Sequence, residues 1–107
     1  MTPRMALTYT TALILDALAR GHGYGFEIMD VTGLPSGTVY PALRRLEAFG
    51  HVASRWEEDF APTKEGRPAR RYYTLSGEGE AVLATARRRF PGLGRWDAAF
   101  GGDPAPA

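Results

Sequence analysis

The sequence predicts a mainly helical protein with a small β-hairpin, arranged as a winged helix-turn-helix. Three observations support this fold class. Apolar residues recur at helical spacing in three successive segments before residue 50. Two short segments rich in β-forming residues then flank a loop with proline and glycine, and a further helical segment follows. With 107 residues, the chain has the length of one domain with a modest core.

The first helix is expected within residues 6–21. Its apolar stripe consists of Leu7, Thr11, Ile14, Leu15 and Leu18. Leu13 lies off this stripe, so the helix is expected to bury two sides. Gly21 ends the run.

A short second helix is expected in residues 23–33. Tyr24, Ile28 and Val31 fall on one side of it, and Gly33 is the expected stop. A short turn then leads to a third helix in the stretch SGTVYPALRRLE, residues 36–47, with Ser36 as its expected N-cap. Val39, Leu43 and Leu46 are spaced to face inward.

Residues 51–58 and 69–75 are expected to form the two strands of the wing, joined by the loop DFAPTKEGRPA. Alternation places Arg71 with Tyr73 on one face and Arg70 with Tyr72 on the other. One of these arginines is expected to pair with an acidic residue of the first strand, Glu57 or Glu58, as an alternative to a phosphate contact. Ser76 is the expected N-cap of a last helix, about residues 77–90.

The outward side of the third helix predicts contact with nucleic acid. Ser36 and Thr38 provide a small, hydroxyl-bearing helix start that a phosphate can approach. Arg44 and Arg45 are candidates for guanine edges, and Tyr40 lies beside them. The chain has no asparagine or glutamine, so it lacks the side chains that usually read adenine. The alternative for each arginine is a solvated surface charge.

Two further contacts are expected outside this helix. Lys64 and Arg67 at the tip of the wing are candidates for phosphate contacts, in a strip that is basic although the net charge is only +1. Tyr24 begins the second helix, where its hydroxyl could meet the DNA backbone. Burial with a satisfied hydroxyl is the equal alternative for Tyr24.

Several function classes are disfavoured. There is no cysteine, and neither HExxH, GxSxG nor a P-loop pattern occurs. His22 and His51 each lie beside a glycine in a predicted turn, so we expect no enzyme, no cofactor and no metal site. The longest apolar stretch is too short to span a bilayer, and a cytoplasmic protein is expected. The alternative function is a winged helix used for protein–protein docking.

Three segments together resemble the PadR family of bacterial transcriptional regulators: LILDALARGHGYGFEI, SGTVYPALRRLEAFGHV and GRPARRYYTLSGEG. They cover roughly residues 12–80. The resemblance implies a homodimer, usually a repressor, that binds a palindromic DNA operator through the third helix and wing. The implied contacts fall on Ser36, Thr38, Tyr40, Arg44, Lys64 and Arg67, and Tyr24 matches the tyrosine that opens the second helix. The order Pro35-Ser36 departs from the Ser-Pro of many members.

The resemblance is to the short subgroup, which lacks an extended C-terminal domain. It implies a DNA-binding domain over residues 1–75, a C-terminal dimerisation helix and short tail over 76–100, and a disordered tail over 101–107. The implied dimer contacts are Leu7, Thr8, Leu13, Val82, Leu83, Ala86 and Phe90. The alternative is that this stripe packs on its own domain. Trp96 and Phe100 are candidates for a pocket that holds a small aromatic effector, or they simply close the core.

Overall fold

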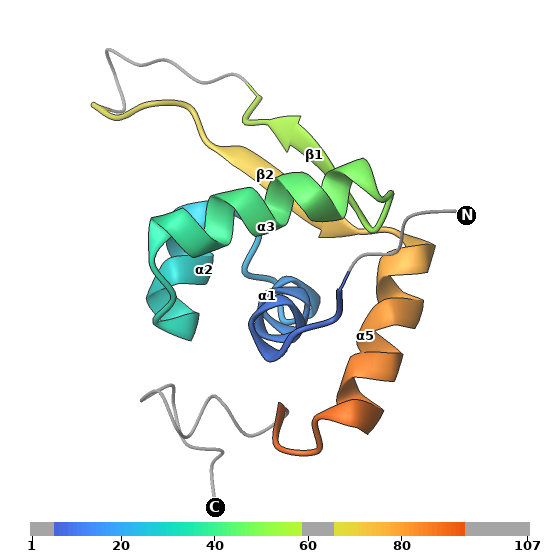
Figure 1. Cartoon of the computed structure of the whole chain (residues 1–107). Coiled ribbons are helices and arrows are strands. Elements are labelled where there is room, and N and C mark those ends of the chain that lie inside the picture. The colour runs from blue at the N-terminus through green and yellow to red at the C-terminus, as the bar shows by residue number, and fades with distance from the viewer. Residues whose placement is uncertain (1–5, 59–65, 94–107) are drawn as a thin grey trace, which may run out of the picture.

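The elements follow one another in the predicted order, helix, helix, helix, hairpin, helix (Figure 1). The computed structural model describes residues 6–58 and 66–93. The elements are α1 (Tyr9–Ala19), α2 (Gly25–Thr32), α3 (Ser36–Ala48), β1 (Val52–Trp56), β2 (Arg71–Leu75) and α5 (Gly77–Arg89). Among the described residues, no helix has the length and apolar character needed to cross a membrane.

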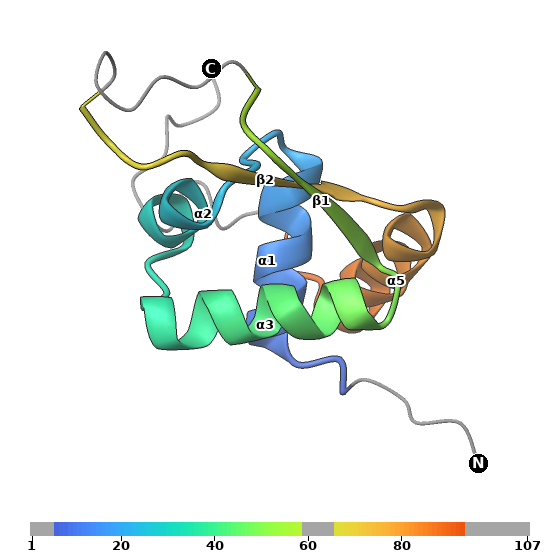
Figure 2. The same cartoon turned by 90° about the horizontal axis from the view of Figure 1, so that it is seen from above.

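Helix α1 forms the centre of the core. All its residues from Thr11 to Leu18 are buried, which confirms that more than one side of this helix is covered. Viewed from above, α1 lies between α2 and α5, with the hairpin passing over it (Figure 2). Leu15, Ile28 and Leu43, from three different helices, are fully buried together in this core.

The start of α3 differs from the prediction in one residue. Pro35, and not Ser36, is the N-cap, with extended backbone at φ −76° and ψ 160°. The Pro35 carbonyl accepts hydrogen bonds from the N–H groups of Thr38 (2.9 Å) and Val39 (3.0 Å). The backbone of Ser36 is already helical, so its side chain is exposed and caps nothing. The predicted stop at Gly33 is confirmed by its left-handed φ of 75°.

The hairpin is anchored to the helical body along β2. Strands β1 and β2 are antiparallel, with Val52 opposite Leu75 and Trp56 opposite Arg71. On its other edge, β2 meets the segment before α2, where the Tyr73 N–H donates to the Gly23 carbonyl at 2.6 Å and Tyr24 bridges to Tyr72. The base of the wing is therefore held on both sides.

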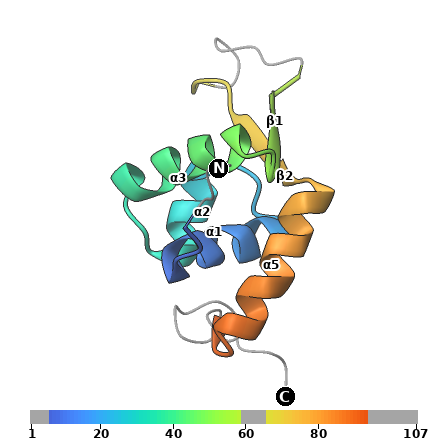
Figure 3. The same ribbon diagram turned by 45° about the vertical axis from the view of Figure 1, so that its right-hand side comes forward.

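Helix α5 closes the core from the opposite end of the chain. The Ser76 hydroxyl accepts a hydrogen bond from the Gly79 N–H (3.0 Å), as expected of an N-cap. Helix α5 packs against α1 and runs away from the hairpin (Figure 3). The buried carboxylate of Asp16 on α1 is bound by Arg20 (2.8 Å) and by Arg87 of α5 (3.0 Å).

Candidate nucleic-acid interface

The outward side of α3 is open, as the sequence predicts. Ser36, Tyr40, Arg44 and Arg45 are exposed, and Thr38 is half-buried. The opposite side of the helix carries Val39, Leu43 and Leu46, which are fully buried. The amphipathic pattern thus fixes the rotation of α3 and directs both arginines away from the core.

Tyr40 is positioned by a glycine of the neighbouring helix. Its ring lies so close to the Cα of Gly25 that a Cβ atom at position 25 would overlap the ring. The tyrosine therefore rests on the first turn of α2 while 41% of its surface stays exposed. This packing fixes an aromatic ring beside the arginines of α3.

Helix α3 and the hairpin lie on the same side of the molecule. In Figures 1 and 3 both occupy the upper part, whereas the C-terminal end of α5 points the opposite way. The hairpin extends from the C-terminal end of α3 back past its N-terminal end (Figure 1). A duplex against α3 would consequently meet the wing as well.

Arg67 is held by an acidic residue of the hairpin. Its guanidinium donates two hydrogen bonds of 2.9 Å to the two carboxylate oxygens of Glu57. This hydrogen bonding, reinforced by the backbone N–H of Arg70, lowers the pKa of Glu57 from 4.5 to about 2 although partial burial opposes the shift. The cross-hairpin ion pair was predicted for Arg70 or Arg71, but the side chain that makes it belongs to Arg67.

Arg71 links the wing to α3. Its guanidinium donates to the Ser54 hydroxyl of β1 and, at 3.2 Å, to the carboxylate of Glu47 on α3. It also lies near the ring of Tyr73, 5.8 Å from the centroid, as the predicted alternation requires. Because Glu47 is engaged in this way, the one acidic side chain of α3 is partly neutralised.

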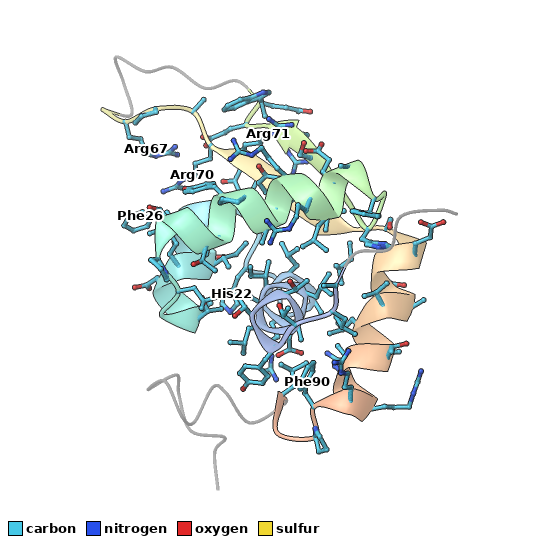
Figure 4. All side chains as sticks on the ribbon, in the orientation of Figure 1. His22, Phe26, Arg67, Arg70, Arg71 and Phe90 are labelled. Carbon is cyan, nitrogen blue, oxygen red and sulfur yellow. The ribbon has the colours of Figure 1, made fainter. Side chains whose placement is uncertain are left out.

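Tyr24 takes part in a stack at the base of the wing. The guanidinium carbon of Arg70 lies 4.3 Å from the centroid of the Tyr24 ring, and the Tyr72 ring meets Tyr24 edge-on at 5.6 Å. Tyr24 is half-buried, and the contact of its hydroxyl with the DNA backbone stays a prediction. Figure 4 shows Arg67 and Arg70 on the same side of the molecule as Phe26 of α2.

The predicted dimer residues are largely covered by the chain itself. Leu13, Leu83 and Ala86 are at most 3% exposed and belong to the core. Leu7, Val82 and Phe90 are partly buried against that core. Phe90 meets the ring of Tyr9 edge-on at 5.4 Å, far from the wing (Figure 4). The predicted site residues Lys64, Trp96 and Phe100 lie outside the described residues.

Some residues of this surface were not singled out from the sequence. Phe26 and Trp56 are 69% and 61% exposed, and both lie on the side of the wing and α3. Glu47 positions the wing arginine Arg71. The sequence offered only one indication of such pairs, acidic residues opposite a basic strand, and this does not specify which residues pair.

In residues 6–58 and 66–93, no three His, Cys, Asp or Glu side chains form a group that could hold a metal ion.

Fold and surface together define a winged-helix, DNA-binding transcription regulator. The family model described as the transcriptional regulator PadR-like family matches residues 14–85, and the chain belongs to this family. Its members are DNA-binding regulators and not enzymes. The comparison with curated proteins finds no match.

Solved structures agree with this assignment. A PadR family transcription regulator from Clostridium difficile R20291 is 26% identical, with a TM-score of 0.66, over 89% of this chain and 100% of that chain. A PadR-like transcription factor from Bacteroides fragilis is 26% identical, with a TM-score of 0.63, over 79% of this chain and 82% of that chain. Bordetella bronchiseptica BpsR, whose DNA binding is regulated by 6-hydroxynicotinic acid, shares the fold. It is 20% identical, with a TM-score of 0.66, over 97% of this chain and 73% of that chain. These similarities confirm the winged-helix prediction.

Proposed function

We propose that the protein is a cytoplasmic bacterial repressor that binds a palindromic operator as a homodimer. The observation that carries this proposal is the open, arginine-bearing side of α3 beside a wing on the same side of the molecule. A dimer places two such helices on one duplex, and its two-fold symmetry is matched by a palindrome.

Each exposed group has a role that suits its chemistry. Ser36 and Thr38 at the helix start donate to phosphate oxygens. Arg44 and Arg45 reach guanine edges in the major groove, with Tyr40 against the adjoining sugar or methyl groups. Lys64 and Arg67 meet phosphates beside the groove, and the ion pair with Glu57 sets the position of Arg67 on the wing. The Tyr24 hydroxyl is a further backbone contact.

The homodimer is supported by the size of the chain and by apolar side chains near α1 and α5 that are only partly buried. A chain of 107 residues buries a limited core, so association adds stability. Leu7, Val82 and Phe90 keep part of their surface open, and Leu13, Leu83 and Ala86 form the layer beneath them.

DNA binding is tested by titrating a fluorescent duplex from the upstream region of the protein's own gene, at two salt concentrations. Arg44→Ala is expected to weaken binding by about 1–3 kcal/mol, because it removes a base contact. Arg88→Ala, which removes an exposed arginine of α5, is the matched control and should bind as the unaltered protein does. Equal affinity of the two variants would refute the site.

Tyr40→Ala and Lys64→Ala extend the same measurement to the aromatic contact and the wing. Both should bind more weakly, with the Lys64→Ala loss largest at low salt. If both retain full affinity, the surface is not the DNA contact, and the protein-docking alternative becomes the better account.

A small aromatic effector that releases DNA is also part of the proposal. The regulation of BpsR by 6-hydroxynicotinic acid supports it, because that protein shares the fold. Trp96 and Phe100 are the residues that the sequence suggests for an effector pocket.

A further inference from the structure

Glu47 is the one acidic residue of α3, and its carboxylate receives a hydrogen bond from each strand of the wing. The Ser54 hydroxyl of β1 donates to its Oε2 atom at 2.5 Å, and the Arg71 guanidinium of β2 donates to its Oε1 atom at 3.2 Å. Arg71 also donates to the Ser54 hydroxyl, at 2.8 Å from Nη2 and 3.0 Å from Nε. These three side chains, called the Glu47 network below, therefore connect α3 to both strands.

The position of Glu47 is electrostatically unfavourable in two ways. It lies in the last turn of α3, where the negative end of the helix dipole disfavours an acid. It also lies on the helix that the proposed function places against phosphates, which repel a carboxylate. A specific contact accounts for an acid at such a position, and the Glu47 network is that contact.

Packing fixes only the base of the wing. Of β1, only Val52 is buried. Strand β2 is bonded to the Gly23–Tyr24 segment along one edge, and a sheet held along one edge can still rotate about it. Between the wing, α2 and the start of α3 lies a cavity of about 570 Å³, lined by the aromatic side chains of Tyr24, Phe26, Tyr40, Trp56 and Tyr73. Close-packed side chains would restrict rotation there, whereas the cavity leaves room for it.

We propose that Glu47 is a positioning residue for DNA recognition, which sets the angle between the wing and α3 without touching DNA. This inference rests on the proposed function. The wing and α3 must reach one duplex together, and a wing that is free to rotate loses that freedom when DNA binds, at a cost in affinity. The side chains of Arg71 and Glu47 are 43% and 33% exposed, and ion pairs so exposed contribute little to global stability. Loss of Glu47 should therefore release the wing without unfolding the chain.

The sign of the effect on DNA binding separates positioning from charge. Glu47→Ala removes a negative charge from the DNA-facing helix, so electrostatics alone predicts tighter binding to any duplex. We expect it instead to bind the upstream duplex at least about fivefold more weakly, as loss of a coupling between interacting elements does. A scrambled duplex of the same length should be bound no more weakly than by the unaltered protein.

Glu58→Ala is the matched control. It removes the same charge from an exposed position of the wing outside the Glu47 network. It should bind both duplexes at least as tightly as the unaltered protein does.

Ser54→Ala tests the network without any change of charge. It removes the central hydroxyl and should weaken binding to the upstream duplex in the same direction as Glu47→Ala. Thr85→Ala removes a hydroxyl of α5 and should leave binding unchanged. Arg67→Ala should cost less affinity in the Glu47→Ala background than in the unaltered protein, because a released wing no longer positions that contact. Circular dichroism checks that each variant stays folded.

Residual dipolar couplings of the backbone amides measure the orientation of the wing in the full chain without DNA. In the unaltered protein, couplings from β1, β2 and α3 should fit one common orientation. In Glu47→Ala, those of the strands should shrink relative to those of α3. Unchanged couplings in Glu47→Ala, or equal affinities of Glu47→Ala and Glu58→Ala for the upstream duplex, would each overturn the proposal. If the unaltered protein binds no DNA, the proposed function fails, and the couplings alone decide whether Glu47 sets the angle of the wing.

Discussion

Gly79 shows how one missing side chain allows two elements to meet. It lies in the first turn of α5, where its Cα faces the backbone carbonyl of His51 in the turn before β1. A Cβ atom at this position would overlap that carbonyl oxygen, and a backbone atom cannot swing aside as a side chain can. The contact joins the turn between α3 and β1 to the last helix.

Gly79→Ala is expected to destabilise the protein by about 1–3 kcal/mol, because the added methyl group overpacks the contact. Gly77→Ala is the control in the same helix turn, with nothing within 4 Å of its added Cβ. It should be neutral or slightly stabilising, by less than about 1 kcal/mol. Urea unfolding of both variants measures the difference, and equal midpoints would contradict the expectation.

Glu57 provides a prediction about pH. Its pKa is lowered to about 2 in the folded chain, so its ion pair stabilises the wing fully above its ordinary pKa of 4.5. That stabilisation is lost as the pH falls from 4.5 toward 2. Carbon-detected NMR of the Glu57 carboxyl should give a midpoint near 2, and Arg67→Met should return it toward 4.5. A midpoint of 4.5 in the unaltered protein would rule out the pair.

At this scale, the sequence predicts those residues whose role follows from local spacing. Val39, Leu43 and Leu46 were correctly placed in the core, and Ser76 and Gly33 at helix ends. The cap of α3 was missed because proline supplies only an extended backbone and no capping side chain. The preference for a hydroxyl residue at that position therefore selected Ser36, one residue too late.

At the scale of elements, the contact between α1 and α5 depends on a buried charge. Asp16 is fully buried and receives hydrogen bonds from Arg20, which caps the C-terminal end of α1, and from Arg87 of α5. A buried carboxylate requires such partners, since removing one of them leaves charge poorly compensated. The pairing fixes the rotation of α5 relative to the central helix.

Arg87→Ala should destabilise the protein by about 1–3 kcal/mol, because it removes a charge-assisted bond to a buried carboxylate. The neighbouring Arg88→Ala should change the free energy of unfolding by less than about 0.5 kcal/mol, as exposed surface positions usually do. Arg88 is exposed and, within residues 6–58 and 66–93, its side chain donates only to Thr85 of α5. Urea unfolding at neutral pH compares the two, and equal losses would show that the buried pair contributes nothing specific.

The elements themselves could be predicted, but their partners could not. Helical and alternating periods located all six elements to within a few residues. Which arginine pairs with which carboxylate depends on how the hairpin packs against α3. The spacing of residues along the sequence does not determine that packing. The cavity between α2, α3 and the wing was missed for the same reason, although each of its aromatic residues was visible in the sequence.

At the scale of the whole molecule, association is the main expectation that remains to be tested. Phe90 closes α5 at the edge of the core and retains some exposure. In the homodimer that we propose, Phe90→Ser should raise the dissociation constant of the dimer several-fold, because it removes apolar area from the interface. Analytical ultracentrifugation measures this shift.

Arg88→Ser is the control for that measurement and should leave association unchanged. Circular dichroism checks that both variants keep their helices. If the unaltered protein sediments as a monomer at all concentrations, the proposed homodimer is wrong, whatever result the variants give.

The double attachment of β2 has a consequence for how DNA sequences are told apart. Bonded to β1 along one edge and to the Gly23–Tyr24 segment along the other, the wing's root has no hinge within the described residues. The distance between the wing and α3 is therefore set when the chain folds, before any duplex binds. In the DNA complex that we propose, the duplex must therefore adjust its groove width and bend, and sequences that deform easily gain an advantage at base pairs that no side chain touches.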